Sequence, residues 1–147
     1  MSSLEEKNHR ILVADCDVKL LRHISNIIEL FGYKAVQAKN GREAYRILEH
    51  EPNFSLCIIE ANLPEFDGLN LVQFMRYDQK LREVPVIMIG ADGSLKAQSV
   101  SFNIGELVFL PKPFKNSQLQ TMIGLLINRQ ESRSKKHNYA YRLAYST

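Results

Sequence analysis

The sequence lacks the features of a membrane protein, a secreted protein or a disulfide-rich protein. No apolar run approaches the ~20 residues that a membrane-spanning helix needs. The first residues, 1–10, are polar and lack the apolar segment of a signal peptide. The only cysteines, Cys16 and Cys57, sit within apparent strand regions, which predicts free thiols. We therefore expect a cytoplasmic protein with no membrane partner.

Most of the chain also lacks an excess of charge of either sign. The net charge of +3 comes from 19 basic and 16 acidic residues. Residues 129–147 contribute +4, so the preceding part is nearly neutral and gives no sign of a nucleic-acid surface. With 147 residues, of which 45% are hydrophobic, one domain with a substantial core is expected.

Short apolar runs alternate with stretches whose apolar residues recur every three or four positions. The runs predict strands at 10–14, 33–37, 54–59, 85–89 and 107–110. The periodic stretches predict helices at about 18–31, 41–51, 68–78, 94–103 and 117–129. Strictly alternating strands and helices predict a parallel sheet with helices on both faces.

The ends of the chain and the ends of the helices carry their own signals. Residues 1–9 are interpreted as a leader, 10–129 as the domain, and 130–147 as a basic, tyrosine-containing tail or linker without a helical apolar pattern. Asp17 is the expected N-cap of the first helix, and Gly32 is expected to end it. The four histidines show no metal-ligand spacing and are expected at the surface.

Charged residues stand where the strands end. Asp15 and Asp17 follow the first strand, Glu60 ends the third, and Lys112 follows the fifth. If these strands are neighbours, the charges meet at one edge of the sheet. Carboxylates and a carbonyl there suit Mg²⁺, and a lysine suits phosphate oxygens. The simpler alternatives are a helix-cap cluster for the two aspartates and an ordinary solvated lysine.

Four motifs resemble the receiver domain of two-component response regulators. They are ILVADCD at 11–17, EANLPEFDG at 60–68, PVIMIGA at 85–91 and KPF at 112–114, and they extend the resemblance over about 9–129. It implies a flavodoxin-like, doubly wound, five-stranded parallel sheet of order 2-1-3-4-5 with five helices. It also implies a cycle in which a histidine kinase's phosphoryl group passes to an aspartate, with Mg²⁺ bound, at the end of the third strand.

Several positions keep what the family pattern requires. Asp15 matches the first acid of the acidic pocket, in which Asp17 also lies. Lys112 matches the phosphate-side lysine, and the Lys112–Pro113 bond is expected to be cis as in the family. Phe109 stands at the aromatic switch position, and Asn62 stands where a backbone carbonyl binds the metal.

Three positions depart from the pattern. Cys16 replaces the second, metal-ligating acid, Glu60 replaces the phosphoacceptor aspartate, and Gly90 replaces the threonine or serine that binds the phosphoryl group. Glutamate is longer by one methylene, and misplacing an attacking oxygen slows phosphoryl transfer. A cysteine sulfur suits Mg²⁺ poorly. We expect no resident cofactor, and only weakened Mg²⁺ binding at Asp15, Glu60 and Asn62.

The departures predict a degenerate receiver, or pseudo-receiver, that is not an enzyme beyond residual self-phosphorylation. It would act through protein–protein interaction, with Glu60 directed at Lys112 and imitating part of the charge of a phosphorylated site. The expected partners are a histidine kinase, an output protein or a second copy, bound through the fourth helix, fifth strand and fifth helix. One alternative is a competent receiver that uses Glu60 or Asp15 with Mg²⁺. A less favoured one is a nucleic-acid-associated module acting through the basic tail.

Overall fold

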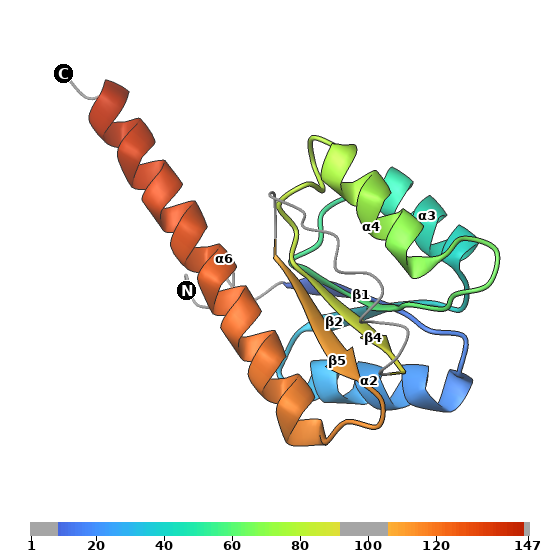
Figure 1. Cartoon of the computed structure of the whole chain (residues 1–147). Coiled ribbons are helices and arrows are strands. Elements are labelled where there is room, and N and C mark those ends of the chain that lie inside the picture. The colour runs from blue at the N-terminus through green and yellow to red at the C-terminus, as the bar shows by residue number, and fades with distance from the viewer. Residues whose placement is uncertain (1–8, 92–105, 146–147) are drawn as a thin grey trace.

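The computed structural model describes residues 9–91 and 106–145, with side chains as far as residue 132. Its centre is a five-stranded parallel sheet in the order β2-β1-β3-β4-β5 (Figure 1). The strands are β1 (Arg10–Ala14), β2 (Lys34–Ala38), β3 (Leu56–Glu60), β4 (Val86–Gly90) and β5 (Leu107–Pro111). This order confirms the predicted flavodoxin-like sheet, and each strand lies close to its predicted position.

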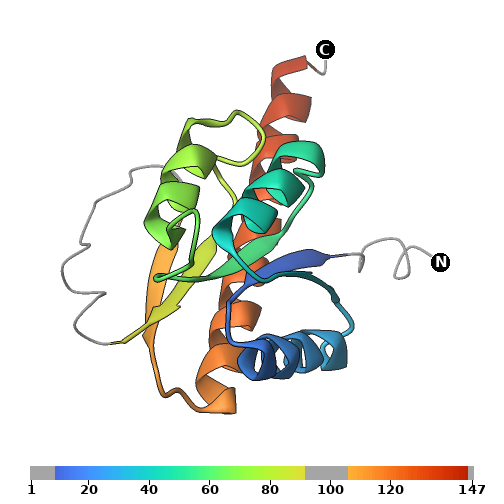
Figure 2. The same ribbon diagram turned by 90° about the vertical axis from the view of Figure 1, so that its right-hand side faces the viewer.

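Within the described residues, four helices cover the two faces of the sheet. They are α2 (Val18–Leu30), α3 (Gly41–His50), α4 (Gly68–Tyr77) and α6 (Asn116–Tyr145). Helices α3 and α4 lie on one face, and α2 and α6 on the other (Figure 2). The helix predicted at 94–103 lies outside the described residues.

The alternation of side chains along the strands explains why the strand sequences are apolar without interruption. In β1, Leu12 and Ala14 pack in the core under α3 and α4, whereas Ile11 and Val13 pack under α2 and α6. Because successive side chains point to opposite faces, a strand covered on both sides needs apolar residues at every position. The carboxyl ends of β1, β3 and β4 are therefore held by cores on both faces.

The ends of α2 have the predicted causes. The Asp17 carboxylate accepts hydrogen bonds from the backbone N–H of Lys19, at 3.1 Å, and of Leu20, at 3.3 Å. These bonds satisfy donors that the first turn of a helix leaves free. Gly32 has a φ of +85°, in the left-handed region that glycine adopts without strain, and it turns the chain toward β2.

The final helix is longer than the sequence pattern indicated. The helix predicted at 117–129 is α6, and it continues unbroken to Tyr145 instead of giving way to a tail. Residues 130–145 contain neither proline nor glycine and include glutamine, glutamate, arginine, lysine, alanine and leucine, which favour helix. They lack apolar periodicity, and periodicity alone was therefore the wrong criterion. No helix of the described chain has the length and apolar character needed to cross a membrane.

Candidate functional site

The acidic and basic side chains meet where the register of the strands predicts. Ala14 pairs with Ile59, so Asp15 and Glu60 leave β1 and β3 at the same level of the sheet. On the other side of β4, Gly90 pairs with Pro111, and the Lys112 backbone N–H donates to the Gly90 carbonyl at 2.8 Å. This bond places the backbone of Lys112 at the same edge of the sheet, and its side chain extends toward the two acids.

Lys112 bridges the two carboxylates. Its Nζ contacts Glu60 Oε2 directly and lies 3.4 Å from Asp15 Oδ2. Asp15 is 2% exposed and Glu60 is 7% exposed. Within the described residues, neither of these oxygens has another hydrogen-bond partner, so Lys112 is the group that compensates their charge. The other Asp15 oxygen, Oδ1, accepts from the Asp17 backbone N–H at 2.8 Å.

The electrostatics of Lys112 follow from this arrangement. Partial burial acts to lower its pKa, because an ammonium loses hydration when it is covered. The hydrogen bond to Glu60 and the charges of Asp15 and Glu60 act in the opposite direction and prevail. The pKa of Lys112 is therefore raised above its ordinary value, and the side chain is a cation at neutral pH.

The loop after Glu60 is fixed by two close backbone approaches. At Gly68, a Cβ atom would overlap the carbonyl oxygen of Glu60, and the Gly68 N–H donates to the Ala61 carbonyl at 3.2 Å. At Gly41, a Cβ would overlap the carbonyl oxygen of Phe66. The Gly41 N–H also donates to the Pro64 carbonyl at 3.0 Å. The first turns of α3 and α4 thus hold the loop that follows Glu60.

The remaining predicted site residues lie around, but outside, the triad of Asp15, Glu60 and Lys112. Cys16 is exposed, and Asp17 uses its carboxylate to cap α2. Asn62 is exposed on the loop, and Gly90 is buried at the end of β4. Phe109 is half-buried and packs against the core under α3 and α4.

The donor atoms at this edge fit Mg²⁺ poorly. Oxygen ligands are what this ion requires, and two carboxylates with a carbonyl are the usual protein contribution. Here Cys16 offers sulfur at one of the acid positions, and the ammonium of Lys112 already contacts both Asp15 and Glu60. No group of three or more histidine, cysteine, aspartate or glutamate side chains suited to a metal occurs among the described residues.

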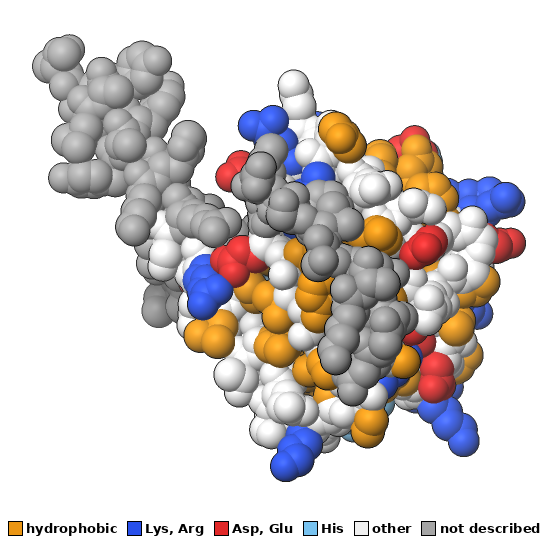
Figure 3. All heavy atoms as spheres, in the orientation of Figure 1, with side chains coloured by type: hydrophobic (Ala, Val, Ile, Leu, Met, Phe, Trp, Pro, Cys, Tyr) orange, Lys and Arg blue, Asp and Glu red, His pale blue; other side chains and the backbone are white. Residues whose placement is uncertain are grey.

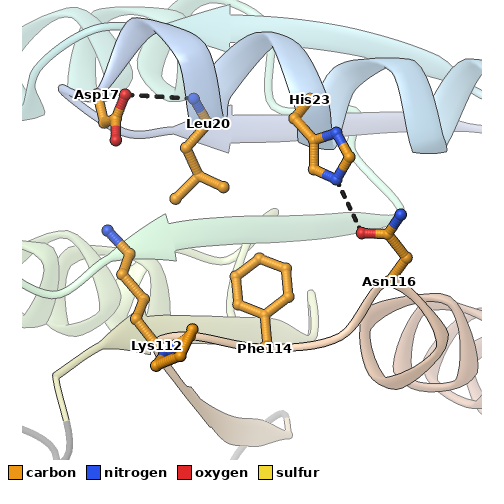
Figure 4. Close-up of a pocket in the computed structure, with 7 residues that line it drawn as sticks. Asp17, Leu20, His23, Lys112, Phe114 and Asn116 are labelled. Atoms are coloured by element: carbon orange, nitrogen blue, oxygen red, sulfur yellow. Dashed lines mark hydrogen bonds between the residues drawn. The ribbon is translucent and has the colours of Figure 1, made fainter.

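A pocket of about 460 Å³ opens beside Lys112, between α2 and the segment that follows β5. Figure 4 shows Leu20 and Phe114 facing its interior, with Lys112 on one side. On the opposite side, His23 and Asn116 are joined by a hydrogen bond of 2.8 Å between Nε2 and Oδ1. The Lys112–Pro113 peptide at its rim is cis, as predicted. Lys112 therefore lines the pocket while its ammonium reaches the acids.

Two polar residues with structural roles were not found from the sequence. Arg76 is 6% exposed, and its guanidinium donates to the carbonyls of Val84, at 2.8 Å, and Glu106, at 3.1 Å. His9 was expected at the surface, but its side chain is only 15% exposed and bonds to Glu131. Arg76, on α4, joins the segments that precede β4 and β5, and His9 contacts a residue far away in the chain, so no local pattern could reveal these contacts.

The fold and the site together define a receiver-type signalling domain, and comparison with known proteins agrees. Residues 11–124 match the family model of the response regulator receiver domain, and the chain belongs to this family. Receiver domains typically interact with histidine kinases and output domains.

Similar proteins include both single-domain and longer regulators. The chemotaxis protein CheY1 of Helicobacter pylori is 28% identical over 123 residues, which cover 83% of this chain and 99% of CheY1. The probable transcriptional regulator ycf27 of Cyanophora paradoxa is 30% identical over 88% of this chain, which spans only 52% of that regulator.

Solved structures show the same architecture. A CheY-like receiver domain protein from Methanospirillum hungatei is 28% identical, covers 86% of this chain and 98% of its own, and superposes with a TM-score of 0.75. A receiver domain protein from Clostridium thermocellum, 22% identical, covers 84% of this chain and 97% of its own with a TM-score of 0.74. The latter supports the fold alone.

Proposed function

We propose that this protein is a signalling module that binds partner proteins without the aspartyl phosphorylation cycle of its family. Glu60 serves as a fixed negative charge held by Lys112, in place of an aspartate that gains and loses a phosphoryl group. On this proposal the chain is not an enzyme, needs no Mg²⁺ and acts in the cytoplasm. The direct contact between Lys112 and Glu60 is the observation that supports the proposal most strongly.

The contact engages both side chains that a phosphoryl transfer at this site would need, the attacking carboxylate and the lysine. An attacking oxygen must be free and in line with the phosphorus atom, and a lysine must be free to neutralise the phosphoryl oxygens. The carboxylate of Glu60 and the ammonium of Lys112 engage each other, and Asp15 lies 3.4 Å away. Transfer would require this ion pair to open inside a nearly buried pocket, where an unpaired charge is costly.

The positions that would respond to a phosphoryl group support the same proposal. Gly90 has no hydroxyl to bind it. Phe109 is half-buried and packs against the core under α3 and α4. On this proposal, the permanent charge at Glu60 keeps β5 in one conformation. We propose that a histidine kinase, an output protein or a second copy binds the face of β5 and α6. Figure 3 shows apolar side chains gathered over this region, where Leu125 is 50% exposed.

The first experiment tests competence for phosphorylation. The protein is incubated with Mg²⁺ and a small phosphoryl donor such as acetyl phosphate, and intact mass is measured. We expect no phosphoryl adduct. A triple variant, Glu60→Asp with Cys16→Asp and Gly90→Ser, restores the family residues and should acquire the adduct. An adduct on the native chain that disappears in Glu60→Gln would overturn the proposal and favour the competent receiver.

The second experiment tests whether the charge at Glu60 maintains the conformation. Glu60→Gln keeps the length of the side chain and removes its charge, so the ion pair with Lys112 is lost. We expect changed amide shifts along β5 and altered binding of the partner protein. Glu65→Gln, at an exposed position of the same loop, is the matched control and should change neither. Equal behaviour of the two variants would refute the role of the fixed charge.

A further inference from the structure

The last part of α6 contains a concentration of positive charge that the receiver fold does not use. Arg133, Lys135, Lys136 and Arg142 all lie after Glu131, and no acidic residue follows Glu131 in the chain. The backbone is helical through Tyr145, so these residues belong to one continuous helix. The rest of the chain is nearly neutral, and the positive potential of the protein therefore centres on this segment.

Among the described residues, two acids at the base of this segment are engaged with the body. Glu131 Oε1 lies 2.9 Å from His9 Nε2, and His9 Nδ1 lies 2.6 Å from the Ser55 hydroxyl. Glu106 Oε2 accepts from Arg129 at 2.7 Å. These contacts fasten α6 to the residues that precede β1, β3 and β5. The contacts hold α6 as far as residue 131, and both acids are already paired with other side chains.

The ribbon of α6 continues past the sheet and away from the other described elements (Figures 1 and 2). An α-helix turns by about 100° per residue. Residues 135 and 142 are seven apart and occupy one side of the helix, whereas residues 133 and 136 are three apart and share another side. Positions 133 and 135 differ by about 200°, whereas positions 135 and 136 differ by about 100°, so the four basic positions spread over more than one side of the helix.

We propose that the segment 132–145 of α6 binds the phosphate backbone of double-stranded DNA, without sequence preference. The major groove of B-DNA is about 12 Å wide, which admits one α-helix, and phosphates border it on both sides. A helix with basic positions on more than one side complements this arrangement of charge. The major groove of duplex RNA is too narrow and deep for a helix, so DNA is the favoured duplex.

An anionic membrane surface suits this segment less well. A helix that lies on a membrane needs a face of large apolar residues in addition to its cations. After Glu131 the only large aliphatic residue is Leu143, accompanied by the small residues Ala140 and Ala144 and by three tyrosines. The segment therefore offers charge without the apolar face that would anchor it in lipid.

Salt dependence gives a quantitative test with the full-length protein. Fluorescence anisotropy of a short labelled DNA duplex gives the affinity at several salt concentrations. Four neutralised phosphates predict a slope of about −3.6 for log K against log salt, which is a loss of about 150-fold between about 50 and 200 mM. Lys135→Gln with Lys136→Gln should halve the slope to about −1.8 and reduce the loss to about 12-fold.

A matched variant separates a local effect from overall charge. Lys19→Gln with Arg22→Gln removes the same charge from exposed positions of α2 and should leave the slope unchanged. The proposal is overturned if the native chain does not bind DNA at low salt, or if both double variants lower the slope equally. It is also overturned if duplex RNA, or vesicles containing an anionic lipid, bind as tightly as DNA and respond equally to Lys135→Gln with Lys136→Gln.

Discussion

Replacing Lys112 by methionine tests the energetics of the site most directly. The change keeps most of the side-chain volume and leaves Asp15 and Glu60 facing each other without a cation. These two residues are 2% and 7% exposed, so water cannot fully compensate their charge. Removing one partner of a buried ion pair costs about 3–5 kcal/mol. Because the Lys112 side chain retains 30% exposure, we expect the lower end, about 3 kcal/mol at neutral pH.

The dependence of this loss on pH has a definite sign. The pKa of Lys112 is raised in the folded protein, so its stabilising contribution is fully present below the pKa of the unfolded chain, about 10.4. This contribution disappears as the pH rises through the higher folded pKa. The difference in stability between the native chain and Lys112→Met should therefore be constant from neutral pH to about 10 and shrink at higher pH.

Urea unfolding followed by far-ultraviolet circular dichroism measures these differences, since the chain has no tryptophan. For a chain of this size, a loss of about 3 kcal/mol corresponds to a fall in Tm of roughly 9 °C. Lys115→Met, at an exposed position nearby, is the control and should change stability by less than about 0.5 kcal/mol. A loss below about 1 kcal/mol at neutral pH, or one that grows in alkali, would refute the description of Lys112 as the cation that compensates this pocket.

Three further predictions concern other parts of the chain. Gly68→Ala should destabilise the protein by about 3 kcal/mol in thermal unfolding, because the new Cβ overlaps the Glu60 carbonyl. Gly124→Ala has open space around the new Cβ and should stabilise the protein by about 0.5 kcal/mol. Burial, opposed in part by a nearby arginine, raises the pKa of the Cys57 thiol to about 12, so a thiol reagent should label Cys16 alone until the protein is unfolded. His9→Ala should remove the hydrogen bonds to Ser55 and Glu131 and lower the free energy of unfolding by about 2 kcal/mol. Amide hydrogen exchange in α6 around Glu131 should become faster, and unchanged exchange would contradict the role of His9.

The sheet and the triad could be predicted because their signals are local. Each strand is an unbroken apolar run, since helices cover both faces, and the acids and the lysine immediately follow such runs. Once the strand order is known, Asp15, Glu60 and Lys112 must meet at one edge. The same reasoning correctly placed Asp17 as a cap, because a cap depends on neighbours in sequence.

The features that sequence reasoning missed depend on contacts between distant residues. His9 contacts Glu131 across almost the whole chain, and nothing near His9 indicates this pairing. Arg76 is buried because carbonyl oxygens from two other segments surround its guanidinium, although arginines are mostly exposed. The length of α6 was missed for a different reason: its final part continues past the sheet (Figure 1), and its sequence has helix propensity without an apolar stripe.

The three departures from the family pattern have a common physical consequence at the carboxyl edge of the sheet. With Cys16 in place of an acid, one fewer carboxylate competes for the ammonium of Lys112. The extra methylene of Glu60 extends its carboxylate toward that ammonium, and the two are in contact. Gly90 adds no hydroxyl that could offer either group another partner. Each change therefore favours the ion pair between Glu60 at the end of β3 and Lys112 after β5, and a lone reversion at any one position should weaken this pair.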